Sequence, residues 1–280
     1  MANKTWMKGA VIVVMAVIAL SGCESKEQKA EKARIAEEQK AREELTAAFA
    51  SLDASAIAEY TKTLAPELIV AVLKDADPKA IPLVLNNASP ALVKTLIQAN
   101  PTPASDFRYG QTANKRGIVI TGYTGRGGAV LIPATIEDMP VLEIGANAFE
   151  GLSDAGNTTA ARSITSLAIP DSVEVIGYAA FTNMGNLTRV TLPDGVKVIP
   201  MNTFNECRRL TTINLPASLE TIEARAFRRC FELTDLVIPD NLTSVRFVRH
   251  DYDYYAFLGC QKLPIRTRQR LEELGYTGQY

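Results

Sequence analysis

Residues 164–186 read ITSLAIPDSVEVIGYAAFTNMGN, and residues 187–209 read LTRVTLPDGVKVIPMNTFNECRR. A third segment, LTTINLPASLETIEARAFRRCFE, follows at 210–232, and a fourth starts with LTDLVIPDNLTSV at 233–245. Each segment begins 23 residues after the one before it. Self-similarity at a fixed period of this length is the signature of a stacked repeat array, in which every repeat is one supersecondary unit.

The array extends beyond these four segments. An earlier, divergent repeat, VLIPATIEDMPVLEIGANAFEGL, occupies 130–152, and residues 153–163 are an insertion before the next repeat. The fourth repeat is interrupted after Val245 and resumes at Ala256. The intervening RFVRHDYDYY, at 246–255, is therefore a second insertion.

Apolar residues recur at the same positions of every repeat. Because no repeat can bury these positions alone, stacking turns each of them into a continuous buried column. Alternation of apolar and polar residues before each proline predicts a short strand, and stacked strands would pair in parallel about 4.8 Å apart. The predicted columns are Ile164/Leu187/Leu210/Leu233, Leu167/Val190/Ile213/Leu236, Ile169/Leu192/Leu215/Ile238, Val173/Val196/Leu219/Leu242, Ile176/Ile199/Ile222/Val245 and Phe181/Phe204/Phe227/Phe257.

The pattern L-x-x-L-x-I/L-P-x-x-V-x-x-I-x-x-x-A-F-x-x-C resembles the BspA-like leucine-rich repeats of host-associated bacteria. The segment ITGYTGRGGAVLIPATIEDMPVLEIGANAF is similar to the entry module of that family, and LPIRTRQRLEELGYTGQY is similar to its C-terminal cap. The resemblance covers about residues 106–280. It implies a parallel-stranded solenoid and surface lipoproteins that adhere to host matrix proteins or to other bacteria. Pro200 and Glu223 depart from the pattern, because they replace the glycine found at Gly145 and Gly177.

The strand positions that point away from the buried columns form the predicted binding surface. A solenoid presents such positions, repeat after repeat, on a concave face. Here they are polar, small and varied, and a wide, shallow surface of this kind suits a protein or glycan partner better than a small substrate. The candidate residues on this predicted concave face are Ser166, Arg189, Thr191, Thr212, Asn214 and Asp235.

The insertion at 246–255 combines arginine with tyrosine, two residue types that are enriched in protein–protein hot spots. The sequence leaves two interpretations open, a partner-contacting loop and a plain surface loop. Catalysis by a His–Asp pair is disfavoured, because no convincing nucleophile accompanies it. The candidate contact residues are Arg246, Arg249, His250, Tyr252, Tyr254 and Tyr255.

Three cysteines fall three residues after the repeat phenylalanine. Cys207, Cys230 and Cys260 occupy the position that Leu152 and Met184 fill in other repeats. A column that accepts Leu, Met and Cys is an apolar packing column, so we predict buried structural thiols rather than nucleophiles. A disulfide between Cys207 and Cys230 stays open, since an oxidising envelope permits one but spacing alone gives no geometry.

The N-terminus reads as an export signal. Lys4 and Lys8 precede the apolar run VIVVMAVIAL at 11–20, which is short for a bilayer span and has the length of a signal-peptide core. The run ends in Leu-Ser-Gly-Cys, which resembles a bacterial lipobox, whose cysteine is acylated and becomes the new N-terminus. We therefore predict a lipoprotein signal peptide at 1–22 and a lipid on Cys23. The alternative is an ordinary secretory signal with a stray cysteine.

The residues after the signal favour helices. Residues 24–44 are almost all Glu, Lys, Gln, Ala and Arg with opposite charges three to four residues apart, which is typical of an exposed helical stalk. Within 45–100, three short segments begin at Pro66, Pro78 and Pro90, twelve residues apart. An Asp or Ser before the second and third proline predicts helix N-caps. We expect a small helical spacer here, with partner docking as the alternative.

Composition excludes several classes of function. The chain has 280 residues with 30 Lys and Arg against 31 Asp and Glu, and this formal net charge of −1 argues against a general nucleic-acid binder. A single histidine and the lack of any C-x-x-C exclude multi-histidine sites, zinc ribbons and thioredoxin-type motifs, so we expect neither metal nor cofactor. The glycines at 122–128 lack the ending of a phosphate loop and are expected to form a hairpin turn.

The sequence thus predicts an α+β fold. A short-helix N-terminal region is followed by a parallel-stranded leucine-rich-repeat solenoid with 23-residue repeats and a C-terminal helical cap. The predicted units are 1–22 signal peptide, 23–45 charged helical stalk, 46–100 short helices, 106–163 entry module and first repeat, 164–262 repeats and 263–280 cap.

The predicted function is binding rather than catalysis. We expect a lipid-anchored cell-envelope protein that binds a macromolecular partner through the solenoid, as surface adhesion to host proteins, including matrix proteins, or to other bacterial proteins. The outer membrane or cell surface is preferred to the inner membrane. The alternative is a periplasmic structural scaffold that holds an envelope partner, and an enzyme is disfavoured.

Overall fold

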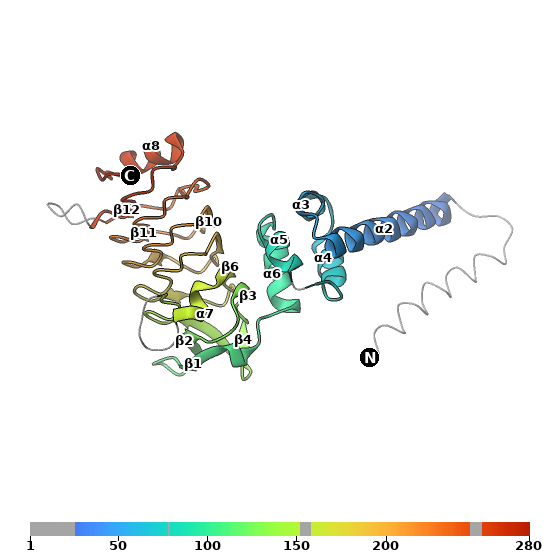
Figure 1. The fold of residues 1–280 in the computed structure, drawn as a ribbon, viewed down its shortest axis with the longest axis horizontal. Helices are drawn as coiled ribbons and strands as arrows, with labels where there is room; N and C mark the ends of the chain where they lie inside the picture. Colours follow the sequence, from blue (N-terminus) through green and yellow to red (C-terminus); the bar gives the residue numbers. More distant parts are fainter. Residues whose placement is uncertain (1–25, 78, 152–157, 247–253) are drawn as a thin grey trace.

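The computed structural model describes residues 26–280 with the exception of 78, 152–157 and 247–253 (Figure 1). The predicted signal peptide and Cys23 lie outside the described residues, so the lipobox stays a prediction. Within the described ranges, no helix combines the length and the apolar character that crossing a membrane requires.

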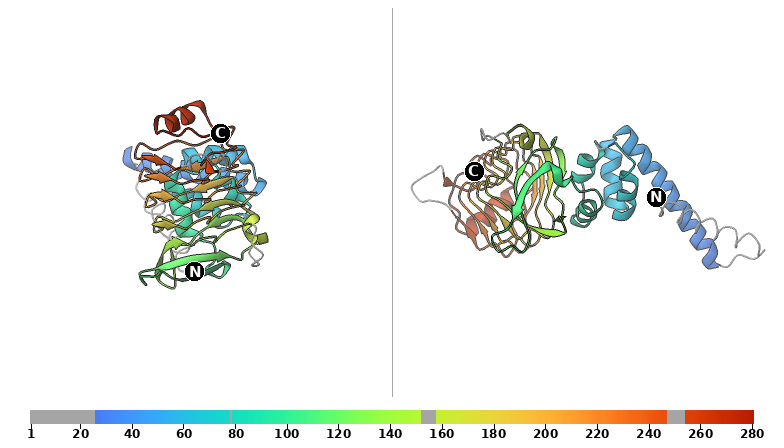
Figure 2. Two further views of the ribbon diagram at one scale, coloured as in Figure 1. Left: turned by 90° about the vertical axis from the view of Figure 1, so that its left-hand side faces the viewer. Right: turned by 90° about the horizontal axis from the view of Figure 1, so that it is seen from below.

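Short parallel strands stack along the C-terminal half of the chain, and Figure 2 shows successive turns of the chain lying on one another. Ser166 pairs with Arg189, and Arg189 pairs with Thr212 on its other side. Every one of these partners is 23 residues from the next, which is the spacing of the sequence repeat. The strands of this first sheet, in the order β10-β8-β6-β3, are β3 (Gly128–Leu131), β6 (Ile164–Ala168), β8 (Arg189–Thr191) and β10 (Thr212–Asn214).

A second set of parallel strands forms the other side of the stack (Figure 1). Each is two residues long, with its first residue directed outward and its second buried, and they follow the turn at the repeat proline. These strands are β7 (Val175–Ile176), β9 (Val198–Ile199), β11 (Thr221–Ile222) and β12 (Ser244–Val245). Two short strands in each repeat therefore enclose one narrow core.

The first turns of the stack contain antiparallel strands. β1 (Phe107–Gln111) pairs antiparallel with β2 (Ile118–Tyr123), and β2 pairs in parallel with β5 (Met139–Ile144). β5 then pairs with β7 and so joins the entry strands to the array. The remaining elements of this half are η1 (Ala104–Asp106), β4 (Thr135–Ile136), α7 (Thr158–Arg162) and α8 (Ile265–Glu273).

Phenylalanine side chains form a continuous stack through the core. The ring centroids of Phe149, Phe181, Phe204, Phe227 and Phe257 follow one another at 5.4, 5.3, 5.4 and 5.2 Å. All five side chains are fully buried, and the last three contacts are close to parallel, at 14°, 14° and 8°. These separations lie in the range of favourable aromatic contacts, and they confirm the predicted phenylalanine column.

The backbone of this column is hydrogen-bonded from repeat to repeat. The Phe204 N–H donates to the carbonyl of Ala226 at 2.8 Å, and equivalent bonds join the other repeats. At the end of the array the Phe257 N–H donates instead to the hydroxyl of Tyr276, at 3.1 Å. The Tyr276 ring also meets the Phe257 ring edge-on at 5.7 Å, and burial raises the pKa of its phenol. Tyr276 therefore occupies the place of a further repeat for both ring and backbone.

Two positions in each repeat adopt a left-handed backbone. Such a conformation costs a residue other than glycine about 1–2 kcal/mol, and it is held here by bonds to the neighbouring repeat. At Glu206, for example, φ is 63° and the N–H donates to the carbonyl of Arg228 at 2.8 Å. The residues concerned are Ala179, Asn202 and Arg225 at the first position, and Asn183, Glu206, Arg229 and Gly259 at the second.

The three cysteines are buried and free, as the packing-column interpretation predicts. The Cys207 thiol donates to the carbonyl of Phe181 at 3.1 Å, and Cys230 makes the same bond to Phe204 at 3.2 Å. Burial raises the pKa of the Cys207 thiol to about 12 and that of Cys230 well above its usual value. A thiolate is therefore strongly disfavoured, and these groups serve as packing side chains.

The glycine-rich segment after β2 does not form the hairpin turn that the sequence suggested. β2 and β3 belong to different sheets, and the segment carries the chain from one to the other. Gly127 has φ +82°, and a Cβ atom there would lie 2.0 Å from the hydroxyl oxygen of Ser163. The glycines thus let the chain pass close to Ser163 as it crosses between the two sheets. The hairpin prediction is wrong because β3 forms its strand-to-strand hydrogen bonds with the parallel strand β6 and not with β2, its neighbour in sequence.

Five helices form a second core before the array. Helix α2 continues past the predicted stalk boundary at residue 45, because its last turns bury Leu45, Ala48 and Phe49 in this core. Ser89 caps α6 by accepting the N–H of Leu92 at 3.2 Å, as predicted. The helices are α2 (Lys26–Ser51), α3 (Ala54–Thr63), α4 (Pro66–Leu73), α5 (Ala80–Leu85) and α6 (Pro90–Ala99).

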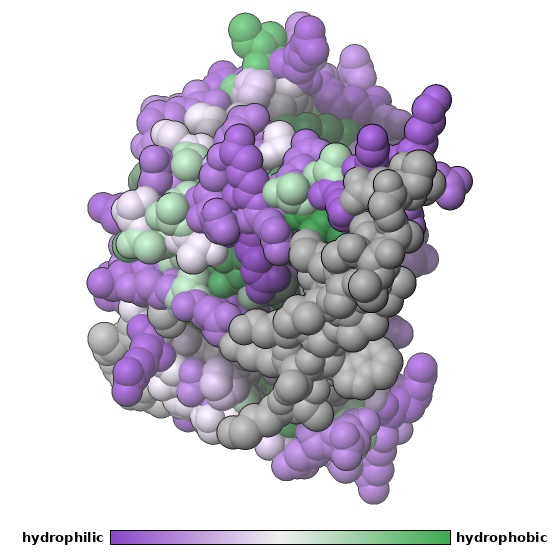
Figure 3. Space-filling model, turned by 90° about the vertical axis from the view of Figure 1, so that its right-hand side faces the viewer, coloured by the Kyte–Doolittle hydropathy of each residue, from purple (hydrophilic) through white to green (hydrophobic). Residues whose placement is uncertain are grey.

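The first turns of α2 project from this helical core (Figure 1). They carry exposed charged side chains, including a Glu31–Arg34 pair at 2.8 Å. Figure 3 shows the helical side of the molecule as a largely hydrophilic surface with only small apolar patches. The exposed, charged helix agrees with the stalk expected from the sequence.

Replacing Phe204 by Ala should open a hole in the middle of the phenylalanine stack. We expect a loss of about 3–5 kcal/mol in the free energy of unfolding, measured by urea denaturation followed by circular dichroism. Phe231→Ala is the matched control, because Phe231 lies in the same array but is 38 % exposed, and it should cost about 1 kcal/mol or less. Equal effects of the two substitutions would contradict the stacked column.

Candidate partner-binding face

Helices α5 and α6 lie beside the sheet that carries the predicted concave face (Figures 1 and 2). Small and aliphatic residues of the sheet join the helical core at this contact, namely Ala129, Leu131 and Ala168. The linker after α6 seals the edge of β3, since Thr102 donates its N–H to the Leu131 carbonyl at 2.8 Å and accepts the Leu131 N–H at 2.9 Å. The helices therefore cover the first part of this face.

The predicted exposure of Ser166 is wrong. Its side chain shares a sheet face with Ala168 and is only 2 % exposed. The sequence places Ser166 at an outward strand position, and it does point away from the array core. It is nevertheless inaccessible to a partner, because the helical region packs on this part of the face.

Arg189 joins the sheet to the helices. Its guanidinium donates to the carbonyl of Asn86 at 3.0 Å and to that of Ala88 at 3.5 Å, just after the end of α5. Burial lowers the pKa of the Arg189 guanidinium, while the nearby charge of Asp235 acts in the opposite direction. The structure thus places this predicted partner-binding residue in an intramolecular contact.

Of the remaining residues of the predicted concave face, Thr191 and Asn214 line a cleft beside α6, whereas Thr212 and Asp235 are not among the residues that line it. Thr191 and Thr212 are partly exposed, and Asp235 is exposed. The Asn214 side chain is paired with the backbone of Leu192, from whose N–H it accepts at 3.0 Å and to whose carbonyl it donates at 3.1 Å. This amide continues the sheet contact past the end of β8, so the open part of the face is a rigid surface.

A cleft of about 290 Å³ separates α6 from the turns that follow the strands of the first sheet. Its helical wall includes Ile97 and Lys94, and its opposite wall includes Leu192 and Leu215. Lys94 forms an ion pair with Asp171 across the contact. Because both units contribute walls, neither the helices nor the repeats alone would form this cleft.

Comparison with known proteins identifies the array. A family model described as a BspA type leucine rich repeat region matches residues 133–264 with six copies. This part of the chain belongs to the BspA-type leucine-rich repeats. A search of curated protein sequences gave no significant match.

Solved structures give the same assignment for the fold. A leucine-rich repeat protein of T. pallidum is 28 % identical with a TM-score of 0.51, and the alignment covers 64 % of this chain and 98 % of that one. A leucine-rich repeat protein from Bacteroides ovatus is also 28 % identical, with a TM-score of 0.44 over 52 % of this chain and 37 % of that longer chain. The family match and the similarity to the T. pallidum protein show a leucine-rich-repeat fold, which in this chain is preceded by helices.

The second insertion of the BspA-type repeats is described only at its ends. Arg246 lies 3.6 Å from Glu223, the Arg225 guanidinium sits 3.8 Å over the Tyr254 ring, and the Tyr255 ring meets Tyr276 edge-on. These contacts attach the described ends of the insertion to the array. The other candidate contact residues, Arg249, His250 and Tyr252, lie outside the described residues.

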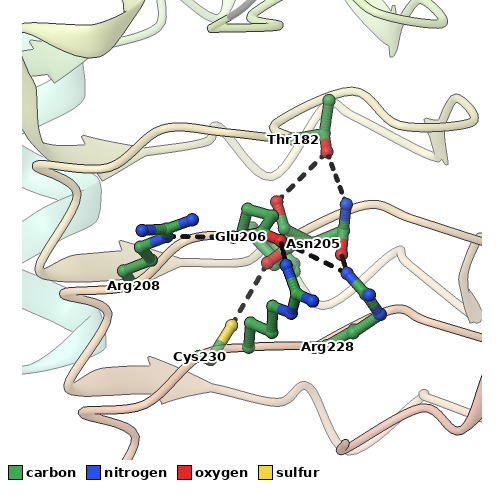
Figure 4. Close-up of polar contacts among 8 residues, drawn as sticks. Thr182, Asn205, Glu206, Arg208, Arg228 and Cys230 are labelled. Carbon is green, nitrogen blue, oxygen red and sulfur yellow. Dashed lines mark hydrogen bonds and ion pairs between the residues drawn. The ribbon is translucent and has the colours of Figure 1, made fainter. Parts of the chain in front are cut away.

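Arginines surround Glu206 on the turns of two adjacent repeats, as Figure 4 shows. Arg229, which is one repeat of 23 residues further on, lies 2.6 Å from its carboxylate, with Arg208 at 2.9 Å and Arg228 at 3.2 Å. Burial alone would raise the pKa of Glu206, but hydrogen bonds from Arg229 and Arg208 outweigh it and lower that pKa. Arg228 could not be identified as a partner from the sequence, because adjacent arginines give no sign of which one turns inward.

Metal ligation has no support in the part of the chain that the structure describes. No group of three or more His, Cys, Asp or Glu side chains is placed there to hold an ion. The arrangement that the repeats do offer is a partly covered, rigid face and an adjoining cleft. Such an arrangement can bind a macromolecule through shape and a few charges.

Removing the Arg189 side chain should loosen the helices from the sheet. Two hydrogen bonds from a charged donor would be lost, which corresponds to a cost on the order of 1–3 kcal/mol. We expect Arg189→Ala to increase amide hydrogen exchange in α5 and α6, measured by mass spectrometry, without unfolding the array.

Arg209→Ala is the control for this experiment, because Arg209 contacts Asn186 within the array at 3.3 Å and none of its described contacts involves the helices. Unchanged exchange in α5 and α6 of the Arg189 variant would show that the guanidinium does not hold the helices in place.

Proposed function

We propose that this chain is a lipid-anchored cell-envelope protein that binds a macromolecular partner through its BspA-type repeats. The observation that carries this proposal is that part of the predicted concave face stays accessible beside the helical region, at the partly exposed Thr191 and Thr212 and at the exposed Asp235. Leucine-rich repeats generally bind proteins, and repeat arrays use extended faces of this kind. The lipid would be attached to Cys23, and the exposed helix α2 would hold the repeats away from the membrane.

Adhesion at the cell surface is the leading form of this proposal. The partner would be a host protein, such as a matrix protein, or a protein or glycan of another bacterium. A wide, polar face suits such a partner. The second form is a periplasmic scaffold, which the long charged helix favours because it can span distance between the anchor and the repeats.

We also propose that the repeat unit is 23 residues long and that α8 with the following chain is a terminal cap. The strand pairing at intervals of 23 residues supports the first part. The second is supported by Tyr276, which accepts the last phenylalanine N–H, and by Thr267, whose hydroxyl donates to the Leu236 carbonyl at 2.7 Å. A polar cap of this kind protects the last core layer from water.

Protease treatment of intact cells separates the two forms of the proposal. Adhesion predicts that the repeats are digested on intact cells, whereas scaffolding predicts digestion only after the outer membrane is permeabilised. Immunoblotting against the C-terminal residues would follow the digestion, and a periplasmic protein would control for membrane integrity. Recovery of the intact protein only in a soluble, lipid-free fraction would contradict the anchor on which both forms rest.

A further inference from the structure

The cleft beside α6 runs along three successive repeats. Its repeat wall is formed by the turns around Ile169, Leu192 and Leu215, and its helical wall by Val93 and Ile97. Neighbouring strands lie about 4.8 Å apart, so three turns span about 10 Å, which is the length of three residues of extended chain. The cleft therefore has the dimensions of a short peptide segment with an aliphatic floor.

The rim of the cleft is acidic. Asp171 and Asp194 follow the strand proline in consecutive repeats, and both line the cleft. Lys94 neutralises Asp171 through its ion pair. Among the described residues, no cation forms an ion pair with Asp194. The position one repeat further on is Ala217, so among the described lining residues Asp194 is the acidic rim group outside an ion pair, although the charge of Lys94 also acts on it.

We propose that this cleft binds a segment of a partner protein in which a lysine or arginine adjoins an aliphatic residue. The aliphatic side chain would pack on the partly exposed Leu215, beside the largely buried Ile97 and Leu192, and the cation would pair with Asp194. The inference rests on the proposed binding function and names the recognition chemistry for one part of that surface.

Charge complementarity favours this occupant over the alternatives. An anionic segment would be repelled by Asp194, and a wholly apolar one would remove water from the Asp194 carboxylate without replacing it. Of the described residues that line the cleft, none is aromatic, so the cleft offers no ring on which a sugar could stack. A peptide with one cationic and one aliphatic side chain can pack on the aliphatic floor and pair with the carboxylate at the rim.

The test uses the purified mature chain and defined peptides. The probe is fluorescently labelled Gly-Ser-Leu-Lys-Val-Ser-Gly, and its two controls carry Glu in place of Lys or Ser in place of both aliphatic residues. Binding is measured by fluorescence polarisation at low and high salt. We expect the Lys peptide to bind at least about tenfold more tightly than either control, with the difference from the Glu peptide reduced by salt.

Substitutions of single residues test whether the peptide binds in this cleft. Asp194→Asn should weaken the Lys peptide by about fivefold or more, whereas Asp240→Asn, at the same repeat position but outside the cleft, should leave it unchanged. Ala217→Trp should fill the cleft and abolish binding, and because Ala217 is exposed, its melting temperature should remain that of the parent.

Three outcomes would overturn the inference: no binding of the Lys peptide, equal binding of the Glu peptide, or equal effects at Asp194 and Asp240. The broader function can be separated from the cleft. A partner that still binds the Asp194→Asn variant but no longer binds the Thr212→Arg variant would support binding by the open face and rule out the cleft as the binding site.

Discussion

Stacking is the constraint on which the rest of the structure depends. A single repeat has two short strands and cannot enclose its own apolar side chains, so each repeat is stable only between neighbours. The rings from Phe149 to Phe257 show this dependence most clearly, because each ring is covered by the ring of the next repeat. The two ends must then be closed, by the aromatic ring of Tyr123 at the start and by Tyr276 at the finish.

The same regularity creates the face on which the helices lie. Outward positions of β3 and β6 are small or aliphatic, which lets α5 and α6 approach closely. Three polar atoms at this contact, Asn100 Nδ2, Arg189 Nε and the hydroxyl of Ser166, are buried within the described structure without hydrogen-bond partners, and Asn202 Oδ1 in the array is in the same state. Each such group costs about 1–3 kcal/mol, so the three groups offset part of the stability that apolar packing gives the contact between helices and sheet.

Periodic features could be predicted from the sequence, and contacts between non-repeating parts could not. The phenylalanine column and the buried thiols follow from the repeat period, because equivalent positions must meet when repeats stack. Ser166 and Arg189 looked like open positions by the same reasoning. The fold shows that helices α5 and α6 cover these two residues. A strand pattern carries no information about a helix that packs on the strand from another part of the chain.

The wrong prediction for the glycine-rich segment has a related cause. Two strand-like stretches separated by glycines suggest a hairpin when only neighbours in sequence are considered, but β2 and β3 each find a better partner in another turn of the stack. The anchor on Cys23 and the role of His250 are different cases, because both lie outside the described residues and stay predictions. The function predicted from the sequence is binding, and the helical cover restricts which part of the face a partner would reach.

The central claim is that a partner contacts the open part of the predicted concave face and no other side of the array. Site-specific photo-crosslinking in living cells tests it directly, with benzoylphenylalanine placed at Thr212 on that face or at Val175, which is 49 % exposed on strand β7 at the other side of the stack. The account predicts a discrete crosslinked species from position 212 and none from position 175. A crosslinked species from position 175 alone would contradict it.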